Sequence, residues 1–519
     1  MRHSALVTGL CLAFACAAPG RIIYVDDDAK APGDGKSWTT AYRYLQDALA
    51  DARGADKPVE IRVGQGVYMP NQHAKQDAGS QWFEVTSGVA LRGGYAGLRA
   101  PDPNVREMQL YRTILSGDLA GDDKDVNDLR NLLTRTRNSR TVVTCYQADK
   151  TALLDGVTIT GGNFAIYSDF RPVGGGGMVV GESDATIANC TFTHNSAAQG
   201  GGAVLIRGGH PTFSNCTFAK NYAGSGGAIV GGDEGATIAN CTFSGNAAYA
   251  GGAVAEYQGT VSNCVFRGNS ANRGGALTGC NGLITNCFFA GNSASEHGGA
   301  VDAGYRDSPT FKNCVFTTNR AAGMGGGLFI YHDTTATLVN CTFSANSGTN
   351  GNALASYSWQ AEHPPSKALL TSCILWDGEK GIWKNDASTI TLNYSDVSGG
   401  YSGIGNIDTD PIFADADNGD YHLKSQAGRW DAATHSWVED NVTSPCIDAG
   451  DPSSPIGVEP FPNGGRINMG AYGGTLQASK SYFGKTACTT IVPGDINGDC
   501  KVDLNDLAIL TAHWLQARQ

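Results

Sequence analysis

Apolar residues recur along the chain in short clusters that are separated by small and polar residues. The clearest unit is Asn-Cys-x-Phe, whose cysteine falls at positions 190, 216, 241, 264, 287, 314 and 341, at intervals of 23 to 27 residues. A period in this range indicates a solenoid. Each unit is too rich in Gly, Thr, Asn and Val for a helical repeat, and its apolar clusters have the length of strands. Three short strands with bends use about 25 residues, so each unit is predicted to form one rung of a parallel β-helix, rising about 4.8 Å.

Four recurring positions in the unit have structural explanations. The phenylalanine and the cysteine two residues before it share one side of a strand, so both are predicted to form inward-facing columns. The asparagine three residues after the phenylalanine is predicted to stack on its counterpart through amide hydrogen bonds and to tolerate left-handed bends. A Gly-Gly pair then permits a tight bend. The phenylalanines are Phe192, Phe218, Phe243, Phe266, Phe289, Phe316 and Phe343, and the asparagines are Asn195, Asn221, Asn246, Asn269, Asn292, Asn319 and Asn346. The cysteine column is therefore predicted to be structural, although rung spacing alone does not exclude disulfides.

The two ends of the repeat array differ from its middle. Residues 36–53 are predicted to form the only long helix near the start, with an apolar face of Leu45, Ala48, Leu49 and Ala52, and this helix is predicted to cap the open end of the solenoid. Residues 59–69 are expected to form a first strand pair, and the polar residues 96–140 a long insertion. The predicted organisation is a signal peptide at 1–18, the cap and first rungs at 21–150, the repeats at 151–400, a closing region at 401–480 and a tail at 488–519.

Composition and the N-terminus limit the functional classes. The chain has 519 residues, 70 glycines and a net charge of −12, and it contains no basic run, which argues against nucleic-acid binding. Arg2, an apolar run and small residues at 15–18 form the pattern of a secretory signal; the alternative is a buried first strand. No later run of about twenty apolar residues follows, so the mature chain is predicted to have no transmembrane helix and to be secreted, extracellular or at the cell surface.

Several segments resemble known families. Phe-x-x-Asn with Gly-Gly-Ala resembles the repeats of chlamydial polymorphic outer membrane proteins. The segments DGKSWTTAYRYLQDALADA, GGYAGLRAPDPN, TILSGDLAGDD and LDGVTITGGN resemble secreted right-handed parallel β-helix proteins of planctomycete-type bacteria, in the pectin-lyase-like superfamily, over most of residues 21–475. Residues 406–474 are similar to the region called choice-of-anchor Q. These resemblances imply an all-β, right-handed parallel β-helix, but no particular activity.

The C-terminal tail carries a calcium-loop pattern. Positions 1, 3, 5, 7, 9 and 12 of an EF-type loop would be Asp495, Asn497, Asp499, the Lys501 carbonyl, Asp503 and Asp506. Leu507, Leu510 and Trp514 fit a short amphipathic helix after it. The tail resembles one half of a type I dockerin, which implies Ca²⁺ and a cohesin-like partner. It departs from that family in having one loop and Cys500 in place of glycine, although a Cys488–Cys500 pair could hold the loop. The alternative is a polar turn that binds nothing.

The wall of the solenoid offers aromatic residues more clearly than it offers a catalytic site. Charged residues after the Gly-Gly-Ala step do not fall at matching positions in adjacent rungs, so no catalytic residue is assigned. If inward positions alternate regularly, Tyr257, Tyr331 and Tyr357 face outward with Trp359 nearby, and Asp302 and Arg306 are polar neighbours. The main hypothesis is a non-catalytic protein that binds extracellular polysaccharide or mediates attachment. The alternatives are a polysaccharide lyase or glycoside hydrolase, favoured by a carboxylate-lined groove at 302–333, and a structural scaffold.

Overall fold

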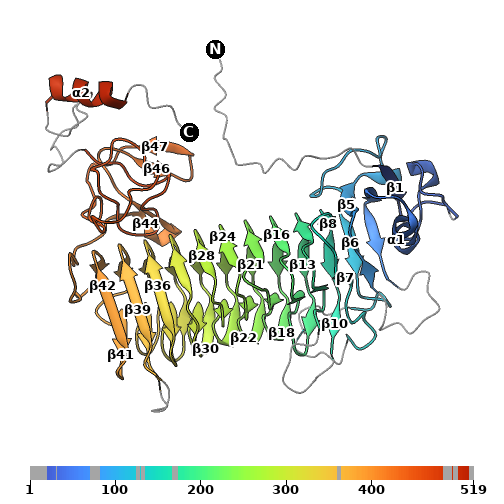
Figure 1. Ribbon diagram of the computed structural model, residues 1–519, viewed down its shortest axis with the longest axis horizontal. Coiled ribbons are helices and arrows are strands. Elements are labelled where there is room, and N and C mark those ends of the chain that lie inside the picture. Colours follow the sequence, from blue (N-terminus) through green and yellow to red (C-terminus); the bar gives the residue numbers. More distant parts are fainter. Residues whose placement is uncertain are drawn as a thin grey trace.

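The computed structural model describes residues 20–30, 32–70, 82–123, 129, 135–165, 174–358, 364–482, 494 and 501–513. The chain winds as a right-handed parallel β-helix, with strands stacked side by side along its long axis (Figure 1). The expected fold class is therefore confirmed. Within the described ranges, no helix is both long and apolar enough to cross a membrane.

Four parallel sheets form the walls. Sheet A consists of β1 (Arg21–Val25), β2 (Val59–Gly64), β5 (Val89–Tyr95), β8 (Leu153–Asp155), β12 (Thr186–Ala188), β16 (Thr212–Ser214), β20 (Thr237–Ala239), β24 (Thr260–Ser262), β28 (Leu283–Thr285), β32 (Thr310–Lys312), β36 (Thr335–Val339), β39 (Lys367–Thr371) and β42 (Thr389–Asn393). Sheet B consists of β3 (Gly66–Tyr68), β6 (Thr113–Ser116), β9 (Thr158–Thr160), β13 (Thr191–Thr193), β17 (Thr217–Ala219), β21 (Thr242–Ser244), β25 (Val265–Arg267), β29 (Phe288–Ala290), β33 (Val315–Thr317), β37 (Thr342–Ser344), β40 (Ile374–Trp376) and β43 (Asp396–Val397). Sheet C consists of β4 (Phe83–Glu84), β7 (Val143–Tyr146), β11 (Met178–Gly181), β15 (Val204–Arg207), β19 (Ile229–Val230), β23 (Val254–Ala255), β27 (Leu277–Thr278), β31 (Val301–Ala303), β35 (Leu328–Ile330), β38 (Leu354–Ser356) and β41 (Ile382–Lys384). Sheet D consists of β10 (Asn163–Phe164), β14 (Ser196–Ala197), β18 (Tyr222–Ser225), β22 (Ala247–Ala250), β26 (Ser270–Arg273), β30 (Ser293–His297) and β34 (Arg320–Ala321).

A rung in the middle of the solenoid passes through the sheets in the order A, B, D, C. The sequence pattern predicted three strands per rung, and sheet D is the fourth. Its strands follow the repeated asparagine directly and were expected to be bends. Short polar and small residues such as Ser270 and Ser293 give little apolar signal, which explains the omission.

The predicted inward columns of phenylalanine and cysteine are present. From Phe192 to Phe343 the rings stack in one file, with centroids 4.4–4.9 Å apart and planes within 9° of parallel. The eight cysteines of the column are buried free thiols: Cys190, Cys216, Cys241, Cys264, Cys287, Cys314, Cys341 and Cys373. Each thiol donates to the carbonyl two residues earlier, as Cys264 does to Ser262 at 3.1 Å. The column fills a corner of the core without forming a disulfide.

The inward asparagines form the expected ladder. The Asn246 Oδ1 accepts both the backbone N–H and the side-chain amide of Asn221, each at 3.0 Å, and this pattern repeats from rung to rung. These residues do not adopt the left-handed conformation. The asparagines of the Asn-Cys step adopt it instead, with φ of 50–55°. They form a second file at the corner between sheets A and B, which we call the outer asparagine column: Asn189, Asn215, Asn240, Asn263, Asn286, Asn313 and Asn340.

The Gly-Gly step lies where neighbouring backbones approach closely. A Cβ on Gly252 would lie 2.1 Å from the Gly275 carbonyl oxygen of the next rung. Only glycine leaves room for that approach, so the repeated pair is required by geometry.

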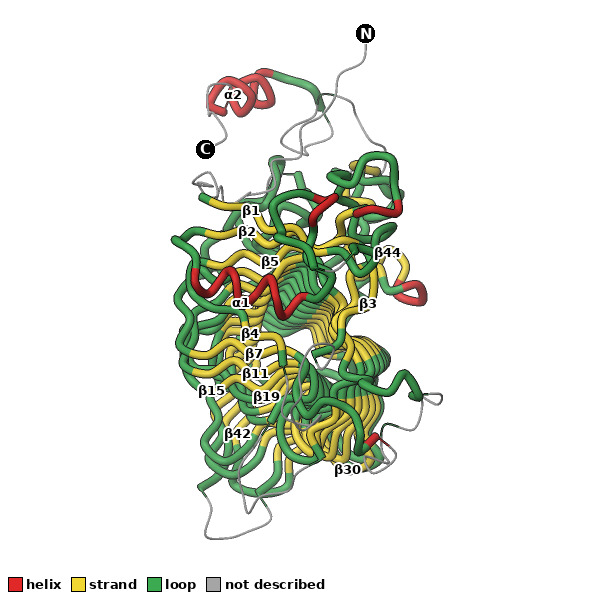
Figure 2. The backbone as a smooth tube through the Cα atoms, turned by 90° about the vertical axis from the view of Figure 1, so that its right-hand side faces the viewer, coloured by secondary structure: helices red, strands yellow, loops and turns green. Residues whose placement is uncertain are grey.

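Helix α1 (Leu45–Gly54) closes the N-terminal end. Figure 2, which looks along the solenoid from that end, shows α1 lying across the stacked strands. The four residues of its predicted apolar face are all buried, which confirms the capping role, but the helix begins at Leu45 and not at residue 36, and η1 (Trp38–Thr40) lies before it. Residues 59–69 form β2 and β3, which belong to different sheets and are not paired with each other. The short 3-10 helices are η1 (Trp38–Thr40), η3 (Gly97–Arg99) and η5 (Ala416–Asn418).

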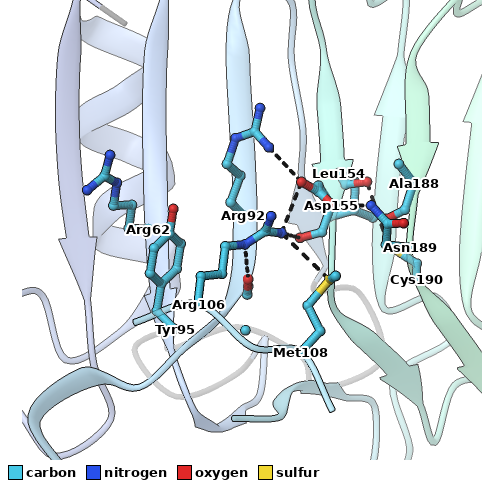
Figure 3. Close-up of polar contacts among 12 residues, drawn as sticks. Arg62, Arg92, Tyr95, Arg106, Met108, Leu154, Asp155, Ala188, Asn189 and Cys190 are labelled. Atoms are coloured by element: carbon cyan, nitrogen blue, oxygen red, sulfur yellow. Dashed lines mark hydrogen bonds and ion pairs between the residues drawn. The ribbon is translucent and has the colours of Figure 1, made fainter. Parts of the chain in front are cut away.

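An ionic network fastens the inserted segment to sheet A (Figure 3). Asp155, whose side chain is 5% exposed, accepts from Arg92 at 2.6 Å and pairs with Arg106 at 2.9 Å. The Asn189 amide donates to the other Asp155 oxygen at 2.8 Å. The Arg106 guanidinium also lies 5.7 Å from the centre of the Tyr95 ring. The predicted insertion at 96–140 is interrupted by β6, which pairs with β3 and β9 in sheet B, so only the parts on either side of β6 are inserted. Because Arg106 comes from the part before β6, these contacts hold that part against the first rungs.

The closing region packs on the outer face of sheet B. It contains the antiparallel pairs β44 (Phe413–Asp415) with β45 (Asp420–Leu423), and β46 (Arg429–Asp431) with β47 (Ser436–Val438). Val315 of the solenoid is buried against Tyr421 and Ala471. The region therefore lies along the flank of the last rungs (Figure 1).

Candidate functional site

The first candidate residue, Tyr257, lies inside the solenoid. It is 1% exposed and belongs to the main core, so the expectation that it faces outward is wrong. The preceding residue, Glu256, has a φ of 55°, which breaks the strand alternation on which that expectation rested. The Tyr257 ring occupies space left by a glycine, since a Cβ on Gly232 would lie 2.5 Å from it. The residue contributes to packing and is not available to a ligand.

Tyr331 and Tyr357 lie at the outer face of sheet C but do not form an open platform. Tyr331 is only 4% exposed, with its ring 5.3 Å from that of Phe329. Tyr357 is half-buried against Trp383, with ring centroids 5.8 Å apart. Trp359 lies outside the described residues. Exposed stacking surface must therefore come from elsewhere on the wall.

Asp302 is buried and Arg306 is exposed, so the two residues lie in different environments. Asp302 is 1% exposed on β31, and burial raises the pKa of its carboxyl group to about 7. The Thr278 hydroxyl donates to its Oδ1 at 3.4 Å, while its Oδ2 has no hydrogen-bond partner among the described residues. Arg306 is largely exposed and lies 3.5 Å from Asp333. The two predicted polar partners thus do not form one site.

A ridge of polar residues at the ends of β26 and β30 lies beside Asp302. Arg273 donates to Glu296 at 2.8 Å, and its charge partly offsets the rise in the pKa of Asp302. His297 accepts the Met324 backbone N–H at 3.1 Å through Nδ1, and burial lowers the pKa of its imidazole. Both effects favour the neutral ring. The charges of this ridge are therefore balanced within the protein.

A shallow groove follows the outer face of sheet D on the other side of that ridge. Its volume is about 480 Å³, and it crosses β18, β22, β26, β30 and β34. The lining residues are Tyr222, Ala247, Ala248, Tyr249, Ser270, Ala271, Asn272, Ser293, Ala294, Ser295, Arg320 and Ala322. Tyr249 is 58% exposed, near one end, and Arg320 lies at the other. The sequence prediction missed the groove because these residues were assigned to a bend.

The groove combines an aromatic surface with small polar residues. Alanine and serine side chains leave room over the strands, while Tyr249 offers a ring that is free to stack on a ligand. Among the described residues that line it there is no aspartate or glutamate, and Arg320 is the one charged residue. Such a surface can bind a neutral or acidic polymer but lacks the carboxylate pair used in glycoside hydrolysis.

The tail is described only in part. Asp495, Asn497 and Asp499 lie outside the described residues, as do Cys488, Cys500 and Trp514. Helix α2 (Leu504–His513) begins within the last positions of the loop pattern, so that Asp506 lies in its first turn, and the Asp503 backbone N–H donates to Asp506 at 2.7 Å. This contact is half of a capping box. The Asp506 carboxylate is 3% exposed, and Leu507 and Leu510 are exposed.

Comparisons with known proteins agree with the fold. The family described as "Right handed beta helix region" matches residues 155–303 and 275–415, together 261 of 519 residues, and "Disaggregatase related" matches residues 384–450. A pectate lyase structure is similar at 13% identity and a TM-score of 0.41, covering 87% of this chain and 96% of its own. A rhamnogalacturonan lyase is similar at 12% identity and a TM-score of 0.33, covering 76% and 91%. No curated protein matches the sequence. With half of its length matched, the chain belongs to the family of right-handed β-helix proteins.

Proposed function

We propose that this protein binds an extended extracellular polysaccharide in the groove over sheet D, without cleaving it. The observation that carries the proposal is Tyr249, which is 58% exposed near one end of a groove that crosses five successive strands. The secreted location rests on the signal-like N-terminus, which precedes the described residues.

The spacing of the groove suits a linear sugar polymer. Neighbouring parallel strands lie about 4.8 Å apart, close to the length of one sugar residue. Ser270, Ser293 and Asn272 can offer hydroxyl and amide groups to successive sugars, and the Tyr249 ring can stack on a sugar face. Contacts that are weak one by one add along a polymer through multivalency. The absence of carboxylates from the lining favours binding over hydrolysis.

Replacing Tyr249 by alanine is expected to weaken polysaccharide binding by about fivefold, since stacking of one ring contributes about 1 kcal/mol. Affinity gel electrophoresis over a panel of neutral and acidic polysaccharides, followed by calorimetry on the best binder, measures the change. Tyr305→Ala is the matched control, because Tyr305 is 63% exposed but does not line the groove. Equal retention of the Tyr249 variant and wild type would reject the groove as the site.

The enzymatic alternative has its own readout in the same experiment. Steady release of reducing or unsaturated ends from any polysaccharide would show that the protein is a hydrolase or a lyase. In that case the raised pKa of Asp302 would make it the first acid to test, although its carboxylate is buried in the described structure.

We also propose that the tail binds one Ca²⁺ and serves as an attachment segment for a cohesin-like partner. The support is the spacing of oxygen donors and the start of α2 at Leu504, which places the last predicted ligand, Asp506, in its first turn. Calorimetry on the full chain is expected to show calcium binding that disappears in Asp495→Ala/Asp499→Ala. Asp118→Ala is the control, since Asp118, Asp122 and Asp123 form a separate acidic group. Calcium heat that persists in the tail variant would place the ion elsewhere.

A further inference from the structure

The closing region is held to the solenoid by the outer asparagine column. The Asn313 side-chain amide donates to the carbonyl oxygens of Ala471 at 2.9 Å and Gly473 at 2.7 Å. On the next rung, the Asn340 amide donates to the carbonyl oxygens of Asn468 at 2.7 Å and Gly470 at 3.3 Å. Two consecutive rungs thus bind one irregular peptide segment through its backbone, without depending on its side chains.

Two further contacts make this site selective for a glycine-containing segment. The Thr342 hydroxyl accepts the Ala471 backbone N–H at 2.9 Å. A Cβ on Gly473 would lie 2.4 Å from the Asn340 amide nitrogen, and a Cβ on Gly470 would lie 2.9 Å from the Thr342 hydroxyl. The Gly473 position would also place a Cβ 2.1 Å from the Asn468 carbonyl oxygen, and Gly470 has a φ of 83°, so a side chain at either position would require the segment to move. The surface Asn340-Cys341-Thr342 therefore receives a Gly-x-x-Gly segment.

The same surface is repeated on rungs that the closing region does not cover. Asn-Cys-Thr recurs at 215–217 and 240–242, and strand register places Thr217 and Thr242 in the same row as Thr342. Asn215, Asn240, Asn263 and Asn286 are exposed and share the left-handed backbone of the bound asparagines. Their side-chain amides make no hydrogen bond to any described residue. By contrast, the first member of the column, Asn189, is bound by Asp155.

The uncovered face is also free of negative charge. In a chain with a net charge of −12, the strands of sheets A and B from β12 to β33 contain no aspartate or glutamate. Their only charged residues are Arg267 and Lys312. No carboxylate on these strands would repel the carbonyl oxygens of an incoming peptide. Beside Asn263 and Asn286, a cleft of about 780 Å³ separates the column from Tyr472 and Leu476 of the closing region, so the free face continues directly from the occupied one.

We propose that the four free rungs of the outer asparagine column dock a Gly-x-x-Gly segment of a partner protein. The asparagine amides donate to its backbone carbonyls, and Thr242, on the rung after Asn215, accepts an N–H between its glycines, as Thr342 on the rung after Asn313 does within this chain. This function is separate from polysaccharide binding, because the column lies at the corner of sheets A and B and the groove lies on sheet D.

The test uses the full-length protein and a fluorescein-labelled peptide with the sequence of residues 466–477, RINMGAYGGTLQ. Fluorescence anisotropy is expected to show saturable binding. The Asn215→Gly/Asn240→Gly variant should bind at least tenfold more weakly, since glycine keeps the left-handed backbone but removes the amide. A peptide with alanine in place of both glycines at 470 and 473 should also bind at least tenfold more weakly. Tyr249→Ala should bind the peptide like wild type.

Three results would overturn the proposal: no peptide binding, equal binding of the alanine peptide, or undiminished binding by a folded glycine variant. Displacement of the peptide by a soluble polysaccharide would also overturn it, by making the column a sugar-binding face. Circular dichroism establishes that the double variant is folded. If it is not, the comparison of glycine and alanine peptides on the unchanged protein decides the question.

Discussion

Replacing Phe243 by alanine is expected to lower the free energy of unfolding by about 3–5 kcal/mol, the usual cost of emptying a phenylalanine site in a core. The Phe243 side chain is fully buried, and its ring stacks between Phe218 and Phe266 at centroid distances of 4.7 Å. The cavity cannot collapse easily, because the strands on both sides are fixed by their ladders. Urea-induced unfolding measures the loss. Since each rung contacts only its neighbours, hydrogen exchange should rise first in residues 212–267.

The control for this change is Tyr249→Ala in the same rung. Tyr249 is exposed on the outer face of sheet D, so its loss should change stability by no more than about 0.5 kcal/mol. A loss below about 1 kcal/mol for Phe243→Ala, or equal losses in both variants, would contradict the view that the phenylalanine column supports the solenoid.

Replacing Asp302 by asparagine is expected to stabilise the protein by about 3–4 kcal/mol at pH 8 and by less than about 1 kcal/mol at pH 4. Burial raises the pKa of this carboxyl group from 3.8 to about 7. The folded protein therefore favours the protonated carboxyl group. The contribution of this preference to the free energy of unfolding is fully present below pH 3.8 and is lost as the pH rises toward 7. A pKa shift of this size corresponds to a change of about 4 kcal/mol in the free energy of unfolding. Asparagine is neutral at both pH values, so the variant does not lose this stability as the pH rises.

Tyr331→Phe is the matched control for Asp302. The Tyr331 hydroxyl lowers the pKa of Asp302 against the larger effect of burial, so its removal should destabilise the protein at pH 8 more than at pH 4. Urea unfolding of both variants and wild type at the two pH values gives the comparison. A difference between Asp302→Asn and wild type that does not change with pH would show that Asp302 titrates like an ordinary surface carboxyl group.

The sequence was sufficient to predict what every rung shares. Phe243, Cys241 and Asn246 recur at fixed spacing, and stacking of identical rungs gives each recurring residue the same surroundings. The buried face of α1 was predicted equally well, because the 3.6-residue period is a local property. Sheet D was missed because its strands are short and rich in serine and alanine, so their strand structure comes from pairing with the neighbouring rungs.

The candidate site was harder to predict because it depends on departures from the repeat. A single left-handed residue, Glu256, reverses the direction of Tyr257, and residue alternation cannot reveal such a conformation in advance. The contacts of Asn313 and Asn340 join residues more than 120 positions apart, and no periodicity in the sequence predicts them. Tyr249 was visible in the sequence, but its exposure follows from the small residues that surround it on sheet D.

The inward asparagine ladder has a direction, and its two ends are built differently. Each asparagine side-chain amide donates to the asparagine Oδ1 of the next rung. The Oδ1 of the first asparagine therefore needs a donor from outside the ladder, and the amide of the last asparagine needs an acceptor. The Gly162 backbone N–H supplies the donor for Asn195 at 3.1 Å, and the Asp377 carboxylate receives the amide of Asn346. Because both terminators lie outside the Asn-Cys-x-Phe units, gene duplication can insert or remove an internal unit of 23 to 27 residues without disturbing either end. The length of the solenoid can therefore change during evolution by whole rungs.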